Sequence, residues 1–291
     1  MDSVLWKQRP RLRSPVLVCA FKGWNDAGEA ATTAIDLLGD RFDASEVAQI
    51  DPEEYFDFTA VRPSVTLEEG TIRRIEWPGW SVESAHVEGA DADLVLLRGA
   101  EPSLRWRAFC DTVIDVANEL GATRVVTLGA LLADVPHTRP VAITGIASDD
   151  SLVERHGFTR SSYEGPTGIV GVLHSACAAA DLPSVSLWAS VPHYVAATPN
   201  PKASLALIRS FEAVTGVAVD ASELEETSED YERQVTAAVA SDPDVKEFVE
   251  RLERAMDEVD DEQLPEQLPS ADTIARDFQR YLRQRGPEEG G

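Results

Sequence analysis

Short apolar runs alternate with amphipathic segments through the first two thirds of the chain. Continuous apolar runs predict buried strands at 15–21, 91–99, 122–133, 141–147 and 184–191, because a strand that is covered on both faces carries no polar alternation. Apolar residues at helical spacing predict helices at 27–38, 104–120, 168–180 and 202–214. This alternation is typical of a three-layer α/β domain with a mainly parallel sheet. We expect the runs at 16–20, 94–97, 124–128 and 185–189 to be neighbouring strands.

The segment from 51 to 88 is less regular than the rest of this region. Its sequence TIRRIEWPGW, residues 71–80, predicts an edge strand, which Pro78 ends because proline cannot donate to a ladder of hydrogen bonds.

The last part of the chain has a different pattern. Residues 243–259 place apolar side chains at helical spacing, with Asp242 or Ser241 as the cap and Pro243 in the first turn. A proline-containing linker follows, and 271–285 predict a final helix. Each helix has one apolar stripe, so it must pack on the core or on a neighbouring subunit. We therefore divide the chain into an α/β core domain, 1–220, and an acidic helical C-terminal subdomain, 221–291.

Charge and composition exclude several classes of function. The net charge is −25, whereas a general nucleic-acid binder needs a basic surface and an anionic membrane attracts basic segments. Over half of this excess lies after residue 220, where 21 acidic and 8 basic side chains give a net charge of −13. The start of the chain lacks the apolar centre of a secretory signal. The three cysteines are scattered, as expected of buried thiols in a reducing compartment. We expect a cytoplasmic protein without a metal site.

Polar residues gather where the predicted strands end, and ligands of open parallel sheets bind at the carboxyl ends of strands. If these loops converge, they form a mixed-charge pocket for a small zwitterionic or hydroxylated ligand or for a charged peptide end. The candidate ligand-binding residues are Lys22, Gly23, Trp24, Asn25, Asp26, Arg98, Glu101, Asp134, His137, Arg139, Tyr163, Glu164, Gly165, Thr167, Gly168 and His193.

Each loop also has a plain structural interpretation. Asn25 or Asp26 can cap the following helix while Glu29 reaches back, as in a capping box. Thr167 can mark an anion-binding helix start or only a cap. His137, with its charged neighbours, can be an acid–base group or a polar surface residue. The sequence assigns no catalytic residue and no cofactor. Because Asn25 and His137 lie in predicted surface loops, we expect their replacement by alanine to change stability by no more than about 0.5 kcal/mol.

Five stretches together resemble the proteasome assembly chaperone 2 family, in its actinobacterial branch. They are GWNDAG, RGAEPSLRWRAF, LGALLADVPHTRP, YEGPTGIVGVLH and SVPHYVAATPNPKA. The excess of arginine over lysine agrees with a GC-rich genome. The resemblance implies a fold like that of nucleoside phosphorylases, and the eukaryotic relatives assist assembly of proteasome rings. Some bacterial members carry an ATP-grasp label, but this sequence has no glycine-rich nucleotide loop that supports it.

Two functions from different classes follow from these observations. The first is a protein-binding or assembly factor, chaperone-like, with a protein client. The alternative is a small-molecule-binding protein or an enzyme, either hydrolase- or phosphorylase-like or a ligase, that uses the loop crevice. Whether the protein is an enzyme stays open at this point. Single apolar stripes on the C-terminal helices predict a homo-oligomer, and the phosphorylase-like fold favours a trimer by analogy.

Overall fold

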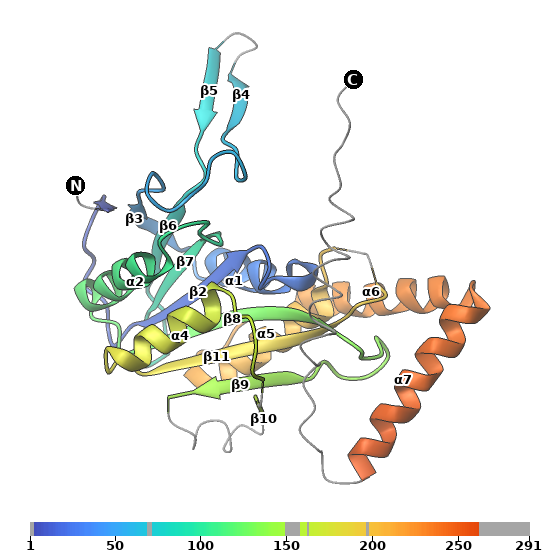
Figure 1. The fold of residues 1–291 in the computed structure, drawn as a ribbon. Helices are drawn as coiled ribbons and strands as arrows, with labels where there is room; N and C mark the ends of the chain where they lie inside the picture. The colour runs from blue at the N-terminus through green and yellow to red at the C-terminus, as the bar shows by residue number, and fades with distance from the viewer. Residues whose placement is uncertain (1–2, 69–71, 149–157, 162, 196–197, 262–291) are drawn as a thin grey trace.

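A mixed nine-stranded sheet forms the centre of the described chain (Figure 1). The computed structural model describes residues 3–68, 72–148, 158–161, 163–195 and 198–261. The strand order is β1-β3-β6-β7-β2-β8-β11-β9-β10, and β4 and β5 form a separate two-stranded sheet. The strands are β1 (Val4–Trp6), β2 (Val16–Lys22), β3 (Ser45–Ile50), β4 (Ser64–Glu68), β5 (Ile72–Glu76), β6 (Trp80–Ala85), β7 (Leu94–Ala100), β8 (Arg124–Ala133), β9 (Ile143–Ala147), β10 (Thr159–Arg160) and β11 (Ser184–Pro192).

The four central strands confirm the prediction from the apolar runs. β7, β2, β8 and β11 are neighbours in this order, and each adjacent pair is parallel. Their carboxyl ends therefore lie at one edge of the sheet. The outer strand β9 runs antiparallel to β11, and β6 runs antiparallel to β7.

Helices cover both faces of the sheet, which makes three layers. Alternate residues of β2 show the division: Val18 packs in the core shared with α1 and α5, whereas Leu17 and Phe21 pack in the core shared with α2 and α4. The three-layer α/β expectation is thus confirmed. The helices are η1 (Ala27–Glu29), α1 (Ala30–Arg41), α2 (Trp106–Leu120), α4 (Ile169–Ala179), α5 (Pro201–Thr215), α6 (Ser222–Ala240) and α7 (Pro243–Asp261).

The segment around TIRRIEWPGW differs from its prediction. β5 does not join the main sheet but pairs with β4 in a hairpin that projects from the body (Figure 1). The strand that continues the main sheet is β6, which begins at Trp80 after the break at Pro78 and Gly79. The predicted edge strand is therefore one arm of a separate hairpin.

Two helices follow the core at its C-terminal side. α6 packs on α5, and α7 packs on α6. Oδ1 of Asp242 accepts hydrogen bonds from the backbone N–H groups of Asp244 (3.0 Å) and Val245 (3.3 Å), which confirms the predicted cap of α7. The predicted helix at 271–285 lies outside the described residues. In the described part of the chain, no helix is both long enough and apolar enough to cross a bilayer.

Candidate functional site

The loop that follows β2 is held by its neighbours through Asn25. The backbone carbonyl of Asn25 accepts a hydrogen bond from the N–H of Ala130 on β8 over 2.8 Å. Its side-chain Nδ2 donates to Oε1 of Glu101, in the loop after β7, over 2.7 Å. Only 1% of Asn25 is exposed. The loop is therefore packed against two neighbouring strands at the carboxyl edge of the sheet.

Glu101 also caps helix α4 from a distant part of the chain. Its Oε1 accepts from the backbone N–H of Ile169, the first residue of α4, over 2.9 Å. A carboxylate at this position satisfies a free N–H group and is stabilised by the positive end of the helix dipole. The residue at the N-cap is Gly168, and a methyl group there would overlap the Asn25 amide. We call Asn25, Glu101, Gly168 and Ile169 the amide–carboxylate lock.

The side chain of Asp26, next to the lock, caps helix α1, which begins at Ala30 after the short helix η1. Its Oδ1 accepts from the backbone N–H groups of Ala31 (2.8 Å) and Thr32 (3.2 Å), and the Thr32 hydroxyl donates to Oδ2 (2.5 Å). These contacts confirm capping by Asp26. The capping box is incomplete, because the Glu29 side chain pairs with Lys22 over 2.8 Å. Burial raises the pKa of Asp26, and this effect outweighs the three hydrogen bonds, which lower the pKa.

A second cluster forms around His137, in the loop after β8. The Thr236 hydroxyl donates to the carbonyl of Glu232 over 2.8 Å, so its oxygen accepts from Nε2–H of His137 over 3.1 Å. Nδ1 then accepts the hydroxyl proton of Tyr194 over 2.8 Å. This assignment satisfies both ring nitrogens with the imidazole neutral. Burial, and then the charge of Lys202, lower the pKa of His137, and burial raises the pKa of Tyr194 to about 12.

Charged side chains around His137 connect the core to α6 and α7. Lys202 donates to the carbonyl of His137 over 2.6 Å and to Glu232 over 2.5 Å. Arg139 forms a bidentate pair with Asp257 on α7, at 2.8 and 2.7 Å. This cluster therefore fastens the C-terminal helices to the carboxyl edge of the sheet, and we call it the helix anchor.

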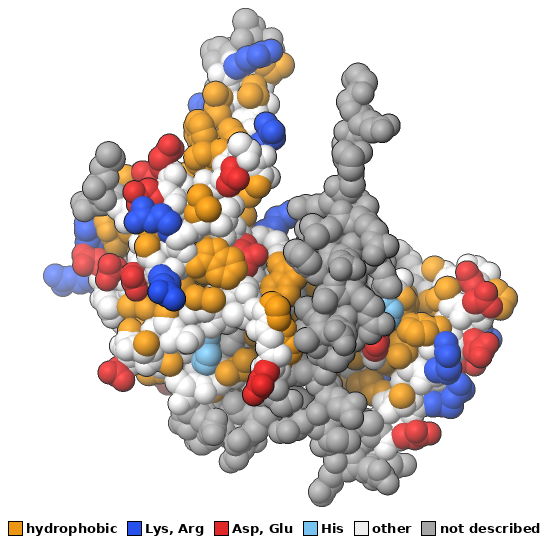
Figure 2. Space-filling model, viewed as in Figure 1, with side chains coloured by type: hydrophobic (Ala, Val, Ile, Leu, Met, Phe, Trp, Pro, Cys, Tyr) orange, Lys and Arg blue, Asp and Glu red, His pale blue; other side chains and the backbone are white. Residues whose placement is uncertain are grey.

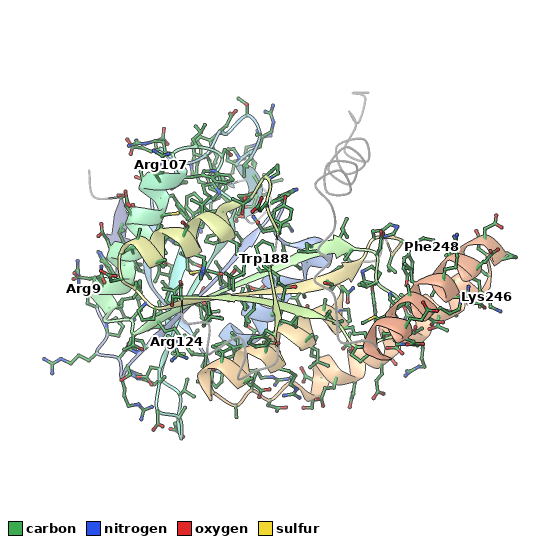
Figure 3. All side chains as sticks on the ribbon, turned by 60° about the horizontal axis from the view of Figure 1, so that its bottom comes forward. Arg9, Arg107, Arg124, Trp188, Lys246 and Phe248 are labelled. Atoms are coloured by element: carbon green, nitrogen blue, oxygen red, sulfur yellow. The ribbon has the colours of Figure 1, made fainter. Side chains whose placement is uncertain are left out.

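Aromatic packing adds to the helix anchor. Phe248 of α7 meets the rings of His193 and Tyr194 edge to face, with centroids 5.6 and 5.9 Å apart (Figure 3). Nδ1 of His193 lies 2.8 Å from Oδ1 of Asp134.

The structure divides the predicted site residues into two groups at one edge of the sheet. Gly23, Asn25, Glu101 and Gly168 belong to the lock or contact it, whereas the helix anchor and its aromatic contacts contain Asp134, His137, Arg139 and His193. Arg98 joins neither group, since it pairs with Glu83 and with Asp36 on α1. Trp24 and Tyr163 are half-buried, and the exposed remainder are Lys22, Glu164, Gly165 and Thr167.

Two residues named as surface-loop groups are buried. Asn25 is 1% exposed and His137 is 3% exposed. Both carry hydrogen bonds to segments that are distant in sequence. The expectation that alanine at these positions leaves stability unchanged rested on exposure, so its premise is wrong.

The space beside the helix anchor is small. A crevice lined by His137, Arg139, Asn200, Lys202 and Tyr231 has a volume of about 10 Å³, which is the room that one water needs. Among the described residues, no three His, Cys, Asp or Glu side chains are arranged to hold a metal ion. Cys19, Cys110 and Cys177 are free and buried, as predicted.

Several partners of the predicted residues were not found by sequence reasoning. They lie on α5, α6 and α7, namely Lys202, Glu232, Thr236, Glu253 and Asp257. Acidic helices were expected there in general terms, but no local pattern pairs Thr236 with a histidine 99 positions earlier. The sequence NPK at 200–202, with Asn200 as the N-cap of α5, was the available signal for the position of Lys202.

The fold and its interlocked loops define a three-layer α/β protein whose C-terminal helices are fastened to the carboxyl edge of the sheet. The chain belongs to the PAC2 family, which matches residues 20–239. A PAC2 family protein from Streptomyces avermitilis MA is 46% identical, with a TM-score of 0.75 over 81% of this chain and 99% of that chain. No curated protein matches the chain.

Two structures from Mycobacterium tuberculosis are also similar. A proteasome-assembly chaperone homologue is 44% identical, with a TM-score of 0.75 over 80% of this chain and 99% of that chain. A protein of unknown function is 27% identical, with a TM-score of 0.82 over 94% of this chain and 95% of that chain. The actinobacterial resemblance read from the sequence is thus confirmed.

Proposed function

We propose that this protein is a protein-binding assembly factor, chaperone-like, whose client is a proteasome subunit. The Mycobacterium tuberculosis relative that is described as a proteasome-assembly chaperone homologue supports the client, since it is 44% identical over 80% of this chain. Protein binding itself is supported by the surface of this chain.

The observation that carries the proposal is the apolar face of the β4–β5 hairpin. Val65 lies opposite Ile75 across the two strands, and Leu67 lies on the same face. Trp77, which follows β5, packs on Phe58 with ring centroids 4.9 Å apart. Among the described residues, six large apolar side chains are prominently exposed, and four belong to this hairpin: Val65 (55%), Leu67 (61%), Ile75 (54%) and Trp77 (56%).

Such a face is typical of a surface that another protein covers. A two-stranded hairpin is marginally stable alone in water, and contiguous exposed apolar patches mark interaction sites. Hydrophobic side chains gather along this hairpin in Figure 2. Burial of the exposed halves of four such side chains would supply a transfer free energy on the order of 4 kcal/mol, before the entropic cost of association is subtracted.

The lock and the helix anchor agree with this function. The carboxylate of Glu101, Nδ2 of Asn25 and both nitrogens of His137 are engaged in contacts that hold the fold together. Groups with such roles serve as structural supports without any substrate. The alternative, a ligand-binding protein or enzyme that uses these loops, stays a prediction.

The test is an assembly reaction with purified components. The full chain is mixed with separately purified proteasome α and β subunits of the same species, and native gels follow the appearance of assembled particles. We expect a complex with the α subunit and faster assembly. The double variant Val65→Ser/Leu67→Ser should lose both effects, whereas Thr66→Ser, on the opposite face of β4, should keep them. The proposal fails if the wild-type chain neither binds a subunit nor changes the rate.

A further inference from the structure

The apolar face of the hairpin also carries a positive charge. Arg73 lies opposite Leu67 in the β4–β5 ladder, so its side chain shares the face of Val65 and Ile75. Arg73 is exposed and has no ion pair among the described residues. An occupant of this face must therefore offer apolar surface with carboxylates beside it.

The same chain presents such a surface between helices α2 and α4. A groove of about 540 Å³ lies there, with Ile114, Val172 and Ala176 as apolar lining. Asp111 and Asp115, one turn apart on α2, line the groove. Arg107, one turn before Asp111, lines it as well (Figure 3). Neither aspartate has an ion pair in the described part of the chain. This volume falls within the roughly 300–1,000 Å³ of pockets that hold drug-sized ligands, enough for two or three apolar side chains.

The hairpin cannot reach the groove of its own chain. It projects away from the body, while α2 and α4 lie across the sheet face below it (Figure 1). A contact between the Arg73 face of the hairpin and the groove that contains Asp111 and Asp115 would therefore join two molecules.

We propose that the β4–β5 hairpin of one copy inserts into the α2–α4 groove of a second copy, with Arg73 facing Asp111 and Asp115. The inference rests on the proposed function in one respect, that the hairpin face binds protein. It names a second copy as the occupant before a proteasome subunit binds, since the two would compete for the same face. A contact between two different surfaces is heterologous, so it repeats head to tail and closes into a ring or continues as a filament.

Charge favours this arrangement over other contacts between two copies. Each chain carries a net charge of −25, and like charges that face one another disfavour association. Across residues 64–76, three glutamates and two arginines give a net charge of −1. The hairpin is therefore much less acidic than the chain as a whole, and its apolar face carries Arg73 towards an acidic surface. The pairs with Asp111 and Asp115 would set the orientation, while the apolar side chains supply the attraction.

The experiment is a charge swap that is followed by sedimentation equilibrium over a wide range of protein concentration. Wild type should self-associate, and Arg73→Glu should weaken self-association at least tenfold. The triple variant Arg73→Glu/Asp111→Arg/Asp115→Arg should restore it, because the charges are exchanged. Arg254→Glu on α7 changes the net charge equally and should behave as wild type. A monomeric wild type, an unaffected Arg73→Glu variant or a triple variant without recovery would overturn the proposal.

A second measurement locates the contact directly. A photo-crosslinking amino acid replaces Leu67, and the chain is mixed with ¹⁵N-labelled wild type before irradiation. We expect mixed-label crosslinks to α2 or α4, whereas crosslinks to any other surface would overturn the proposal. The same variants in the assembly reaction separate the two hypotheses. Restored self-association without binding of proteasome subunits refutes only the proposed function. A monomer that still binds subunits through its hairpin refutes only this inference.

Discussion

The side-chain amide of Asn25 donates to the carboxylate of Glu101 over 2.7 Å and so joins two loops that are 76 residues apart. Gly168 lies against this amide, in a position where any side chain would overlap it. A glycine is therefore needed at position 168, because the Asn25 amide comes too close for a side chain to fit.

We expect Gly168→Ala to lower the free energy of unfolding by about 1–3 kcal/mol, the usual cost of overpacking a dense region. Urea denaturation followed by circular dichroism measures the change. The matched control is Gly79→Ala, where the nearest atom to an added methyl group is 3.8 Å away, so little change is expected. Equal stability of the two variants would show that the Asn25 amide can move aside.

Asp26 should behave as a helix cap whether or not a ligand exists. Asp26→Ala removes an acceptor from two backbone N–H groups at the start of α1, so we expect a loss of about 1–2 kcal/mol. Asp26→Asn keeps an oxygen acceptor and should recover part of that loss. Chemical denaturation of both variants measures this, and an alanine variant as stable as wild type contradicts the assignment.

Acid should weaken the helix anchor through His137. The pKa of His137 is lowered in the folded protein by burial and by Lys202, so folding favours the neutral imidazole. Its contribution to stability is complete above the unfolded-state pKa of about 6.5 and is lost as pH falls through the lower folded-state pKa. We expect the melting temperature of His137→Gln to depend less on pH below pH 6.5 than that of wild type. Parallel melting curves for the two proteins from pH 7 to pH 5 would contradict this.

Removal of Phe248 should loosen α7 without unfolding the core. Phe248→Ala deletes the edge-to-face contacts with His193 and Tyr194, whereas the exposed ion pair of Arg139 contributes about 0–1 kcal/mol and cannot replace them. Hydrogen exchange should become faster within 243–261 and stay unchanged in β2 and β8. Glu247→Ala, an exposed change one residue away, serves as the control. Unchanged exchange in α7 would show that its other contacts suffice.

The central strands could be predicted because both of their faces are buried. Leu17, Val18 and Cys19 are all fully buried in β2, so the run is apolar at every position and stands out in the sequence. The hairpin could not be recognised in this way. Its exposed side chains, such as Leu67, alternate with polar residues, and the same alternation is produced by an edge strand of the main sheet.

The candidate site was harder to predict than the strands for a different reason. Polar residues between strands are usually exposed, and Asn25 and His137 were interpreted by that rule. Their burial depends on partners at Glu101 and Thr236, which are 76 and 99 residues away. Position at the carboxyl edge of the sheet follows from strand order, but the pairing of side chains within that edge is set by tertiary contacts.

The positions of the two clusters in the sequence also set the order in which they can form during synthesis on the ribosome. The lock is complete in sequence once Ile169 has emerged, since Asn25 and Glu101 precede it. The helix anchor must wait for Thr236, Glu253 and Asp257, which all come from α6 and α7. For that interval the His137 loop lacks its partners on α6 and α7, although Tyr194 and Lys202 are already present. A chain that is released before α7 has emerged would therefore keep its sheet but lack the contacts of Phe248, Glu253 and Asp257 at the carboxyl edge.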